Sequence, residues 1–191
     1  MDEEIPRVEF VLLGESRVGN TSLLTRFANE TFPEQTVPTT RMEFNKRIVE
    51  IDGSEVCVRV WDAPGQARHR HIGALYVQRA SGLICAFSFD SPGSFERVES
   101  WVDNARRIRI EDVPIIIVGN KVDLNTGCIP REDIDDLVRR LDIKYIETSA
   151  KTGENVDRVF IELARDVLKR RKESIAPKEE PKIQEQSRKC Y

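Results

Sequence analysis

Short apolar runs rich in β-branched residues recur along the chain and predict strands. Polar segments separate them, and in order they are VEFVLLG, KRIVEI, VCVRVW, LICAFSF, PIIIVGN and KYIETSA. Several are too continuously apolar for a sheet that keeps one face in water. We therefore expect strands that are covered on both faces.

Between these runs, apolar residues recur at the three- and four-residue spacing of helices. The segments with this spacing are 21–28, 95–109, 131–141 and 154–171. Strands that alternate with helices predict an α/β fold with a mostly parallel sheet. The hairpin Ile51-Asp52-Gly53-Ser54 is an exception, because so short an Asp-Gly turn joins antiparallel neighbours. We expect one antiparallel strand at an edge of the sheet.

The end of the chain differs in composition from the rest. From Ser174 onward it holds two prolines, many charges and almost no apolar side chains. Such a segment buries too little surface to offset the entropy lost on ordering. With 191 residues, the chain has the size of one domain. We predict a domain over residues 1–173 and a disordered tail over residues 174–191.

Charge and cysteine content narrow the class of protein. Thirty basic and thirty-three acidic side chains leave a net charge of -3, which gives no support to binding of nucleic acid. The four cysteines are far apart and lack metal-ligand spacing, which favours a reducing, cytoplasmic location. No apolar run is long enough for a signal peptide or a transmembrane helix, so we expect any membrane contact to need a lipid or a partner.

The first strand leads into a glycine-flanked turn and a helix. This arrangement directs backbone N–H groups and the positive end of the helix dipole at phosphates. Asn20 stands where the phosphate-loop pattern requires a lysine that reaches the β- and γ-phosphates, whereas Thr21 keeps the hydroxyl used for Mg²⁺. Arg17 is either a substitute cation or a solvated loop residue. We expect nucleotide contacts from Gly14, Ser16, Arg17, Val18, Gly19, Asn20, Thr21 and Ser22.

Two further motifs follow buried strands. They are Asn120-Lys121-Val122-Asp123 and Ser149-Ala150-Lys151, both at carboxyl ends of strands, where open α/β sheets bind ligands. With these motifs in this order, residues 7 to 171 resemble the Ras superfamily, and most closely its Rab branch.

The resemblance implies how guanine is recognised. Asp123 would accept two hydrogen bonds from guanine, and adenine would leave that carboxylate unpaired, which is a strong discriminator. Lys121 would cover the base, Asn120 would tie the loop to its neighbours, and the Ala150 N–H would meet the guanine oxygen. Ser149 and Lys151 complete this group.

The segment Val60-Trp61-Asp62-Ala63-Pro64-Gly65-Gln66-Ala67 resembles the WDTAGQE motif of Rab proteins. The likeness implies that Asp62 holds Mg²⁺ through water, that the Gly65 N–H senses the γ-phosphate, and that Gln66 is the catalytic residue that orients the attacking water. Pro64 stiffens the turn, and Ala67 removes a carboxylate.

A linker after the first predicted helix supplies two more candidates. In the family register, Phe32 falls beside guanine and Thr39 falls where a threonine binds Mg²⁺ and the γ-phosphate. Phe32 alone would be interpreted as a core aromatic, but this register favours the nucleotide contact. Residues 40–44 read TRMEF in place of the Rab-typical IGVDF, which weakens the expectation of ordinary Rab partners.

Cys190 is the penultimate residue, after the predicted disordered tail. Rab proteins end in two nearby cysteines, and other family members end in a four-residue CaaX box, whereas this chain has neither. A single prenyl group at Cys190 would give only reversible membrane contact. An unmodified Cys190 remains the alternative.

The resemblance implies the small-GTPase P-loop fold, an α/β fold with a six-stranded, mostly parallel sheet and five helices on its two faces. The first functional hypothesis is a Rab-like GTP/GDP switch with Mg²⁺ in vesicle trafficking, peripheral on endomembranes through its tail. An exchange factor, a GTPase-activating protein and effectors would bind residues 33–45 and 63–78.

The second hypothesis is a pseudo-GTPase or weak nucleotide binder that serves as a protein-interaction module. Asn20 separates the two hypotheses, since losing a contact to a charged phosphate costs about 1.5–3 kcal/mol, or roughly ten- to a hundredfold in affinity. Weak GTP hydrolysis therefore remains open at this point.

Overall fold

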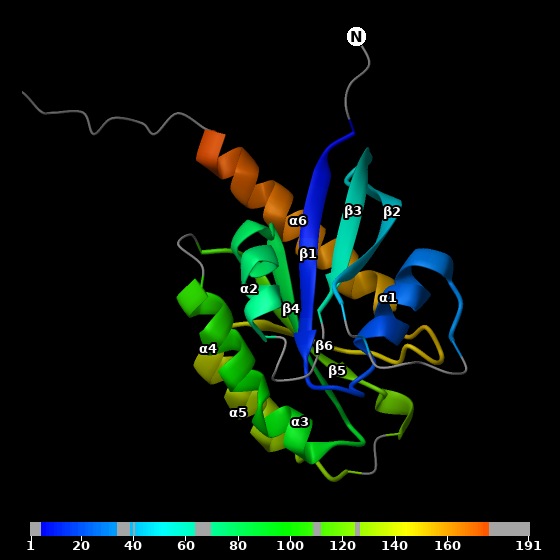
Figure 1. Cartoon of the computed structure of the whole chain (residues 1–191), viewed down its shortest axis with the longest axis vertical. Coiled ribbons are helices and arrows are strands. Elements are labelled where there is room, and N and C mark those ends of the chain that lie inside the picture. Colours follow the sequence, from blue (N-terminus) through cyan, green and yellow to red (C-terminus); the bar gives the residue numbers. More distant parts are fainter. Residues whose placement is uncertain are drawn as a thin grey trace, which may run out of the picture.

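One sheet forms the centre of the molecule in this computed structural model, which describes residues 5–33, 39, 41–63, 70–108, 112–124 and 127–175. Its six strands lie in the order β2-β3-β1-β4-β5-β6 (Figure 1). Their bounds are β1 Arg7–Gly14, β2 Glu43–Ile51, β3 Ser54–Asp62, β4 Gly82–Ser88, β5 Ile115–Asn120 and β6 Lys144–Glu147. Every neighbouring pair is parallel except β2 with β3. The mostly parallel sheet with one antiparallel edge is confirmed.

Helices connect the strands. Their bounds are α1 Asn20–Asn29, α2 Arg70–Arg79, α3 Pro92–Glu96, α4 Val98–Ile108, α5 Arg131–Leu141 and α6 Val156–Ile175. Only Arg97 separates α3 from α4, and together they occupy the place of the single helix predicted over 95–109. The predicted five helices are found if this broken helix counts as one. A short 3₁₀ turn over Val122–Leu124 follows β5.

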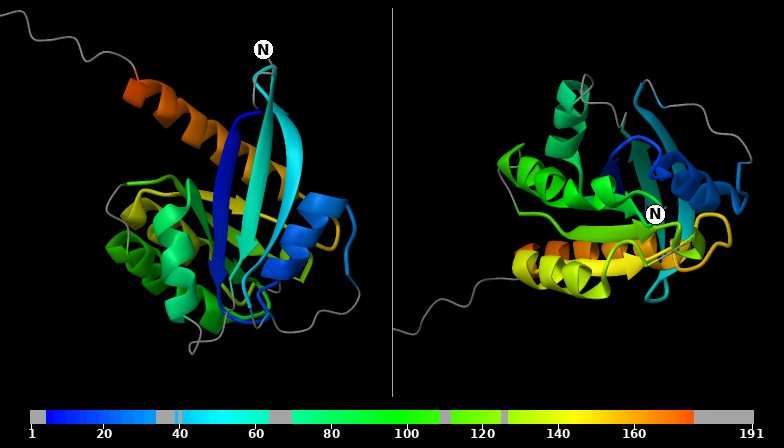
Figure 2. Two further views of the ribbon diagram at one scale, coloured as in Figure 1. Left: turned by 45° about the horizontal axis from the view of Figure 1, so that its top comes forward. Right: turned by 90° about the horizontal axis from the view of Figure 1, so that it is seen from below.

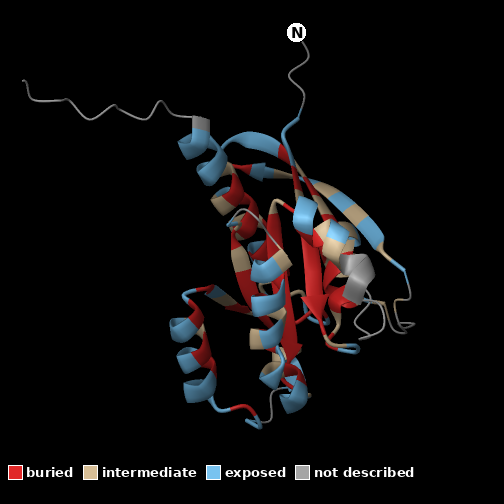
Figure 3. Ribbon diagram, turned by 60° about the vertical axis from the view of Figure 1, so that its left-hand side comes forward, coloured by how far each residue is buried: buried red, intermediate tan, exposed pale blue. Residues whose placement is uncertain are grey.

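Apolar side chains fill both faces of the sheet at β1, β4 and β5, as the continuous apolar runs predicted. The edge of the sheet differs, because β3 buries alternate residues and β2 buries only Ile51. On one face, α1 and α6 pack together, with the rings of Phe27 and Phe160 stacked at 4.1 Å between centroids. On the other face, α2, α4 and α5 cover β1, β4 and β5. All seven residues of β4 are buried. Figure 2 shows α1 and α2 on opposite sides of the strands, and Figure 3 shows buried strands beneath helices with exposed outer faces.

The hairpin between β2 and β3 has the predicted geometry. Ile51 pairs with Ser54, and the two residues between them have positive φ angles, 51° at Asp52 and 79° at Gly53. Such a two-residue turn matches the twist of antiparallel strands. The edge strand β2 is therefore fixed in register by its own turn.

The two ends of the parallel strands differ in character. The turns after β1, β5 and β6 gather at the carboxyl end of the sheet, whereas the start of β1 and the end of α6 lie at the other end (Figure 1). α6 continues to Ile175, two residues beyond the predicted domain boundary, and residues 176–191 of the predicted tail lie outside the described residues. In the described part of the chain, no helix is long and apolar enough to cross a membrane.

Candidate functional site

A pocket of about 520 Å³ opens at the carboxyl end of the sheet. Its size is typical of a small-molecule site. Most of the predicted site residues line it, namely Ser16, Arg17, Gly19, Asn20, Thr21, Ser22, Phe32, Thr39, Asp62, Asn120, Lys121, Asp123, Ala150 and Lys151. The structure thus brings together segments that are far apart in the sequence.

A few predicted residues do not line this pocket. Gly14 ends β1 beneath it, where a Cβ would lie 2.6 Å from the Ala86 carbonyl oxygen. Val18 turns its side chain into the core, and Ser149 is buried behind the pocket wall. Gly65, Gln66 and Cys190 lie outside the described residues, so their predicted roles stay predictions.

Sequence reasoning missed some residues of the lining. Glu15, Pro33, Ala63 and Leu124 all contribute to it, and each is a direct neighbour of a motif residue or of Phe32. Their positions next to predicted site residues in the sequence would therefore have identified them. Leu124 is 47% exposed and contributes an apolar side chain to the lining.

The turn between β1 and α1 adopts backbone angles that bring it close to its neighbours. Gly19 precedes α1 with φ 95°, and a Cβ there would lie 2.5 Å from Nδ2 of Asn120, so only glycine fits. Arg17 has φ 71° although it is not glycine, and its side chain is exposed. The loop therefore leaves Arg17 at the pocket rim without burying its charge.

Asn20 begins α1 and is 7% exposed. Its Oδ1 is buried and has no hydrogen-bond partner among the described residues. A buried polar atom without a partner costs about 1–3 kcal/mol, so its presence points to a ligand or water that completes it. The position that would carry an ammonium group in the phosphate-loop pattern carries an unsatisfied amide instead.

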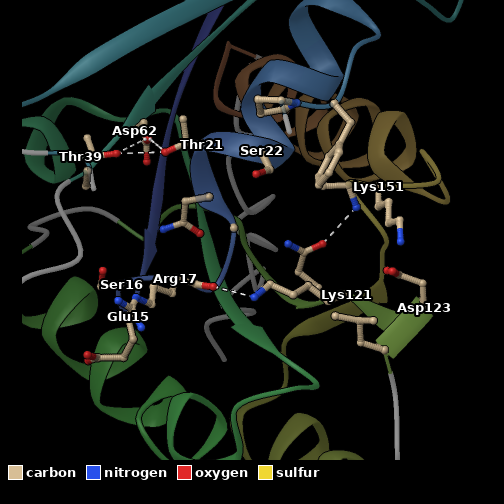
Figure 4. Close-up of a pocket in the computed structure, with 18 residues that line it drawn as sticks. Glu15, Ser16, Arg17, Thr21, Ser22, Thr39, Asp62, Lys121, Asp123 and Lys151 are labelled. Carbon is tan, nitrogen blue, oxygen red and sulfur yellow. Dashed lines mark hydrogen bonds between the residues drawn. The ribbon is translucent and has the colours of Figure 1, made fainter. Parts of the chain in front are cut away.

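Three oxygen-bearing side chains meet at one end of the pocket. The Thr21 hydroxyl donates to Oδ2 of Asp62 at 2.5 Å, the Thr39 hydroxyl donates to the same oxygen at 3.1 Å, and the two hydroxyl oxygens are 3.0 Å apart. Figure 4 shows this cluster across the pocket from Lys121 and Asp123. Hydroxyl and carboxylate oxygens are the ligand type that Mg²⁺ prefers.

The second oxygen of Asp62 supports a cation at this cluster. Oδ1 is buried without a partner among the described residues. Burial raises the pKa of Asp62, although the bonds from Thr21 and Thr39 partly oppose that rise. A buried carboxylate that is short of partners is stabilised by a cation, so the residues present fit Mg²⁺.

Asn120 fastens the opposite end of the pocket. Its Nδ2 donates to the Val18 carbonyl oxygen at 2.8 Å, while its Oδ1 accepts from the Thr148 hydroxyl and from the Ala150 N–H, both at 3.2 Å. Asn120 is 1% exposed. The predicted tie between loops is therefore visible as three hydrogen bonds. The Ala150 N–H, expected to face guanine, donates to Asn120 in this structure.

Asp123 and Lys121 are each held by a neighbour. The Ser149 hydroxyl donates to Oδ1 of Asp123 at 2.5 Å. The Lys121 ammonium donates to the Arg17 carbonyl oxygen at 2.8 Å (Figure 4). It also donates to Oδ2 of Asp90 at 2.9 Å. These bonds fix both side chains at the pocket wall, with the second carboxylate oxygen of Asp123 left for a ligand.

Comparison with known proteins agrees with this geometry. The model described as Ras family matches residues 9–169, which is most of the chain. This chain belongs to the Ras family. Ras-related protein RABE1e of Arabidopsis thaliana is 34% identical over 169 residues, covering 87% of this chain and 78% of that protein. Ras-related protein Rab-13 of Bos taurus is 35% identical over 161 residues, covering 84% of this chain and 79% of that protein.

This Ras-family chain also carries a row of three aromatic rings, of which Phe44 is exposed and Trp61 and Tyr76 are partly buried against the core. Phe44 of β2 and Trp61 of β3 have ring centroids 4.7 Å apart, and the same distance separates Trp61 from Tyr76 of α2. The Arg59 guanidinium lies 4.7 Å from the centre of the Phe44 ring. Phe44 is 45% exposed. This row joins the described parts of residues 33–45 and 63–78.

Proposed function

We propose that this protein is a Rab-like small GTPase, a switch that binds GTP and GDP with Mg²⁺ and acts in vesicle trafficking. One observation carries the proposal. The same pocket holds the fastened Asp123 carboxylate at one end and the Thr21, Thr39 and Asp62 oxygens at the other. A guanine nucleotide is a ligand whose two ends match these two groups.

Guanine selectivity is assigned to Asp123. A carboxylate accepts hydrogen bonds and donates none, so it pairs with the N1–H and exocyclic amine of guanine, and adenine would leave it unpaired. The bond from Ser149 occupies Oδ1 of Asp123 and leaves Oδ2 without a partner among the described residues. Phe32, which is 39% exposed at the pocket lining, supplies an aromatic edge on the ligand side.

The phosphates are assigned to the turn between β1 and α1. The backbone N–H groups around Gly19 and the N-terminus of α1 favour negative charge there. Thr21, Thr39 and Asp62 would hold Mg²⁺, which when bound neutralises phosphate charge. Asn20 offers its amide N–H groups to phosphate but no positive charge, so we expect binding to be weakened rather than abolished.

Hydrolysis depends on the missing lysine more than binding does, since charge at the phosphates grows in the transition state and a lysine would stabilise it there. We assign the water-orienting role to Gln66 and the γ-phosphate contact to Gly65. The observation that favours a pseudo-GTPase instead is the unsatisfied Asn20 amide oxygen at the lysine position. The two functions differ in turnover and share nucleotide binding.

Partner binding is assigned to residues 33–45 and 63–78, together with the aromatic row of Phe44, Trp61 and Tyr76. The rings of this row pack on each other, with Phe44 exposed, and aromatic residues are enriched at interfaces because they present apolar area at little entropic cost. Exchange factors, GTPase-activating proteins and effectors are the expected partners there. We also propose that the domain ends near residue 173 and that a tail with Cys190 gives reversible contact with endomembranes.

The deciding experiment measures nucleotide binding and then turnover. Fluorescent GDP and GTP analogues with Mg²⁺ are titrated into the protein and into Asn20→Lys, and single-turnover hydrolysis follows. We expect guanine-specific binding by both, with tighter binding and faster hydrolysis in Asn20→Lys. Binding by both without hydrolysis in either would favour the pseudo-GTPase. Absence of saturable binding in both would refute the switch.

A further inference from the structure

Arg26, in the middle of α1, makes three hydrogen bonds to backbone carbonyl oxygens. Nε donates to Ala150 at 2.8 Å, one terminal nitrogen donates to Lys151 at 2.6 Å, and the other donates to Glu30 at 2.7 Å. Bonds from a guanidinium are charge-assisted and stronger than those between neutral groups. Two of the three bonds hold the loop that follows β6, which carries the predicted base-recognition residues.

From this loop, a chain of hydrogen bonds continues to Asp123. The Lys151 carbonyl belongs to the same peptide group as the Thr152 N–H, which donates to Oγ of Ser149 at 3.1 Å. The Ser149 hydroxyl in turn donates to Oδ1 of Asp123 at 2.5 Å. Each step polarises the next in the same direction, so the bonds strengthen one another. Arg26 therefore acts at one end of a relay that ends on the base-reading carboxylate.

The loop backbone is shaped around the Arg26 side chain. Gly153 has φ 88°, and a Cβ there would lie 3.8 Å from Cδ of Arg26. The Gly153 N–H donates to the Ser149 carbonyl oxygen at 2.8 Å, which closes the loop on itself. Figure 4 shows Lys151 and Asp123, the two ends of this loop relay, on the same side of the pocket. Arg26 itself is not part of the pocket lining.

We propose that Arg26 is a positioning residue for base selectivity. It fixes the Ser149 hydroxyl, through the Lys151–Thr152 peptide, in the orientation that presents Asp123 to the N1–H and exocyclic amine of the base. Since α1 also begins with Asn20 and Thr21, the same side chain links the phosphate end of the pocket to the base end. The inference rests on the proposed guanine-nucleotide function.

Arg47 provides a matched control. Its guanidinium donates to the Phe27 carbonyl oxygen and to Asp157, both at 3.0 Å, and to Glu30 at 3.0 Å. It therefore ties α1 to its surroundings as Arg26 does, but none of these bonds reaches the loop over residues 149–152. Arg47 belongs to β2, and its bonds hold α1 without contacting the predicted base-recognition loop. If Arg26 only stabilised α1, replacing it should affect base selectivity no more than replacing Arg47.

The test compares affinities for GDP and inosine diphosphate, which lacks the exocyclic amine, in the full chain with Mg²⁺. Because the amine pairs with Asp123, the intact protein is expected to prefer GDP. Arg26→Met should lower that preference about fivefold, the scale of one ordinary hydrogen bond between neutral groups. The preference of Arg26→Lys for GDP should lie between those of the intact protein and Arg26→Met, because one ammonium cannot make all three bonds. Arg47→Met should keep the preference of the intact protein.

A double-mutant cycle tests whether Arg26 acts on base selectivity through Ser149. If Arg26 acts through Ser149, then Ser149→Ala lowers the preference for GDP by a similar factor, and Arg26→Met adds little to it. An unchanged preference in Arg26→Met, or in Arg26→Lys if the methionine variant does not fold, would overturn the proposal while leaving guanine binding intact. Failure of the intact protein to bind GDP would instead remove the proposed function and this inference with it.

Discussion

The two ends of the pocket, proposed above to hold the base and the phosphates and called here the base end and the phosphate end, are built differently. At the base end, Asn120, Lys121, Asp123 and Ser149 are all held by hydrogen bonds to other residues of the chain. At the phosphate end, Oδ1 of Asn20 and Oδ1 of Asp62 are buried without a partner among the described residues. One end is held together by hydrogen bonds within the chain, and the other contains oxygen atoms that no described residue satisfies.

The difference teaches where binding energy is expected to come from. A preassembled site loses little freedom when the ligand enters, so its contacts contribute most of their strength to affinity. Buried acceptor oxygens without partners gain from each cation or hydrogen-bond donor that reaches them, so that gain depends on Mg²⁺ being present. We therefore expect base selectivity to tolerate removal of Mg²⁺ better than affinity does.

The largest expected effect comes from the base end. Asp123→Ala removes two hydrogen bonds to a charged acceptor, about 3–6 kcal/mol in total, so GDP affinity should fall roughly a thousandfold. Isothermal titration with GDP and ADP measures both affinity and selectivity. Asp136→Ala on the exposed face of α5 is the control and should bind GDP normally. Retained selectivity in Asp123→Ala would place base recognition elsewhere.

Asn120→Ala tests whether the two ends are fastened to each other. It leaves the Val18 carbonyl, the Thr148 hydroxyl and the Ala150 N–H without their partner in the interior. We expect unfolding free energy to fall by about 3 kcal/mol, measured by urea denaturation without nucleotide. Thr148→Val removes only one of these bonds and should cost about 1 kcal/mol. Equal losses of unfolding free energy in the two variants would contradict the role of Asn120 as the tie between the loops.

Asp62→Asn tests the unsatisfied phosphate end. Burial raises the pKa of Asp62 above its ordinary value of 3.8. At pH values between 3.8 and the raised pKa, the folded state holds a proton that the unfolded state has lost. The free energy of unfolding therefore falls as pH rises through this range. Without nucleotide at neutral pH, Asp62→Asn should therefore be more stable by about 1 kcal/mol. It should also lose stabilisation by Mg²⁺ with GDP. Thermal melts that show a less stable variant would refute this account.

The smallest effect is expected at Asp90, whose ion pair with Lys121 is partly exposed. Burial raises the pKa of Asp90, but bonds from Ser88 and Lys121 outweigh it and lower the pKa overall. The ion pair therefore stabilises the folded protein fully above the ordinary pKa of an aspartate. That stabilisation is lost as pH falls through the lowered pKa of Asp90. At neutral pH, Asp90→Asn should release GDP about two- to threefold faster, the scale of an exposed ion pair. The two rates should converge in acid.

Most of the fold followed from local pattern. The helix predicted over 131–141 has those bounds as α5, and the Asp-Gly hairpin is present, because apolar spacing and turn residues report on the chain's immediate neighbourhood. The break between α3 and α4 at Arg97 was not predicted. Ser91, Pro92 and the buried Ser94 hydroxyl, which donates to the Ser91 carbonyl oxygen, set the start of α3 by local bonds that apolar spacing does not report.

The candidate site was predicted as far as its motifs extend. Motifs name residues that face a ligand, and most of these residues do line the pocket. Motifs do not name residues that act from behind it. Arg26 contacts a loop more than a hundred positions away in the sequence, and Ser149 lies buried behind Asp123. Contacts of this kind depend on how α1 packs beside the end of β6, which no single segment encodes.

The Arg171 guanidinium joins the last helix to the first strand. It donates to the Arg7 carbonyl oxygen at 2.9 Å and to the Ser81 hydroxyl at 3.0 Å, while Phe160 and Leu163 of the same helix are buried in the core shared with β1. During synthesis the phosphate-loop segment is made early and this helix is made late. The nascent chain must therefore carry β1 without its α6 packing partner until residues 156–175 have left the ribosome.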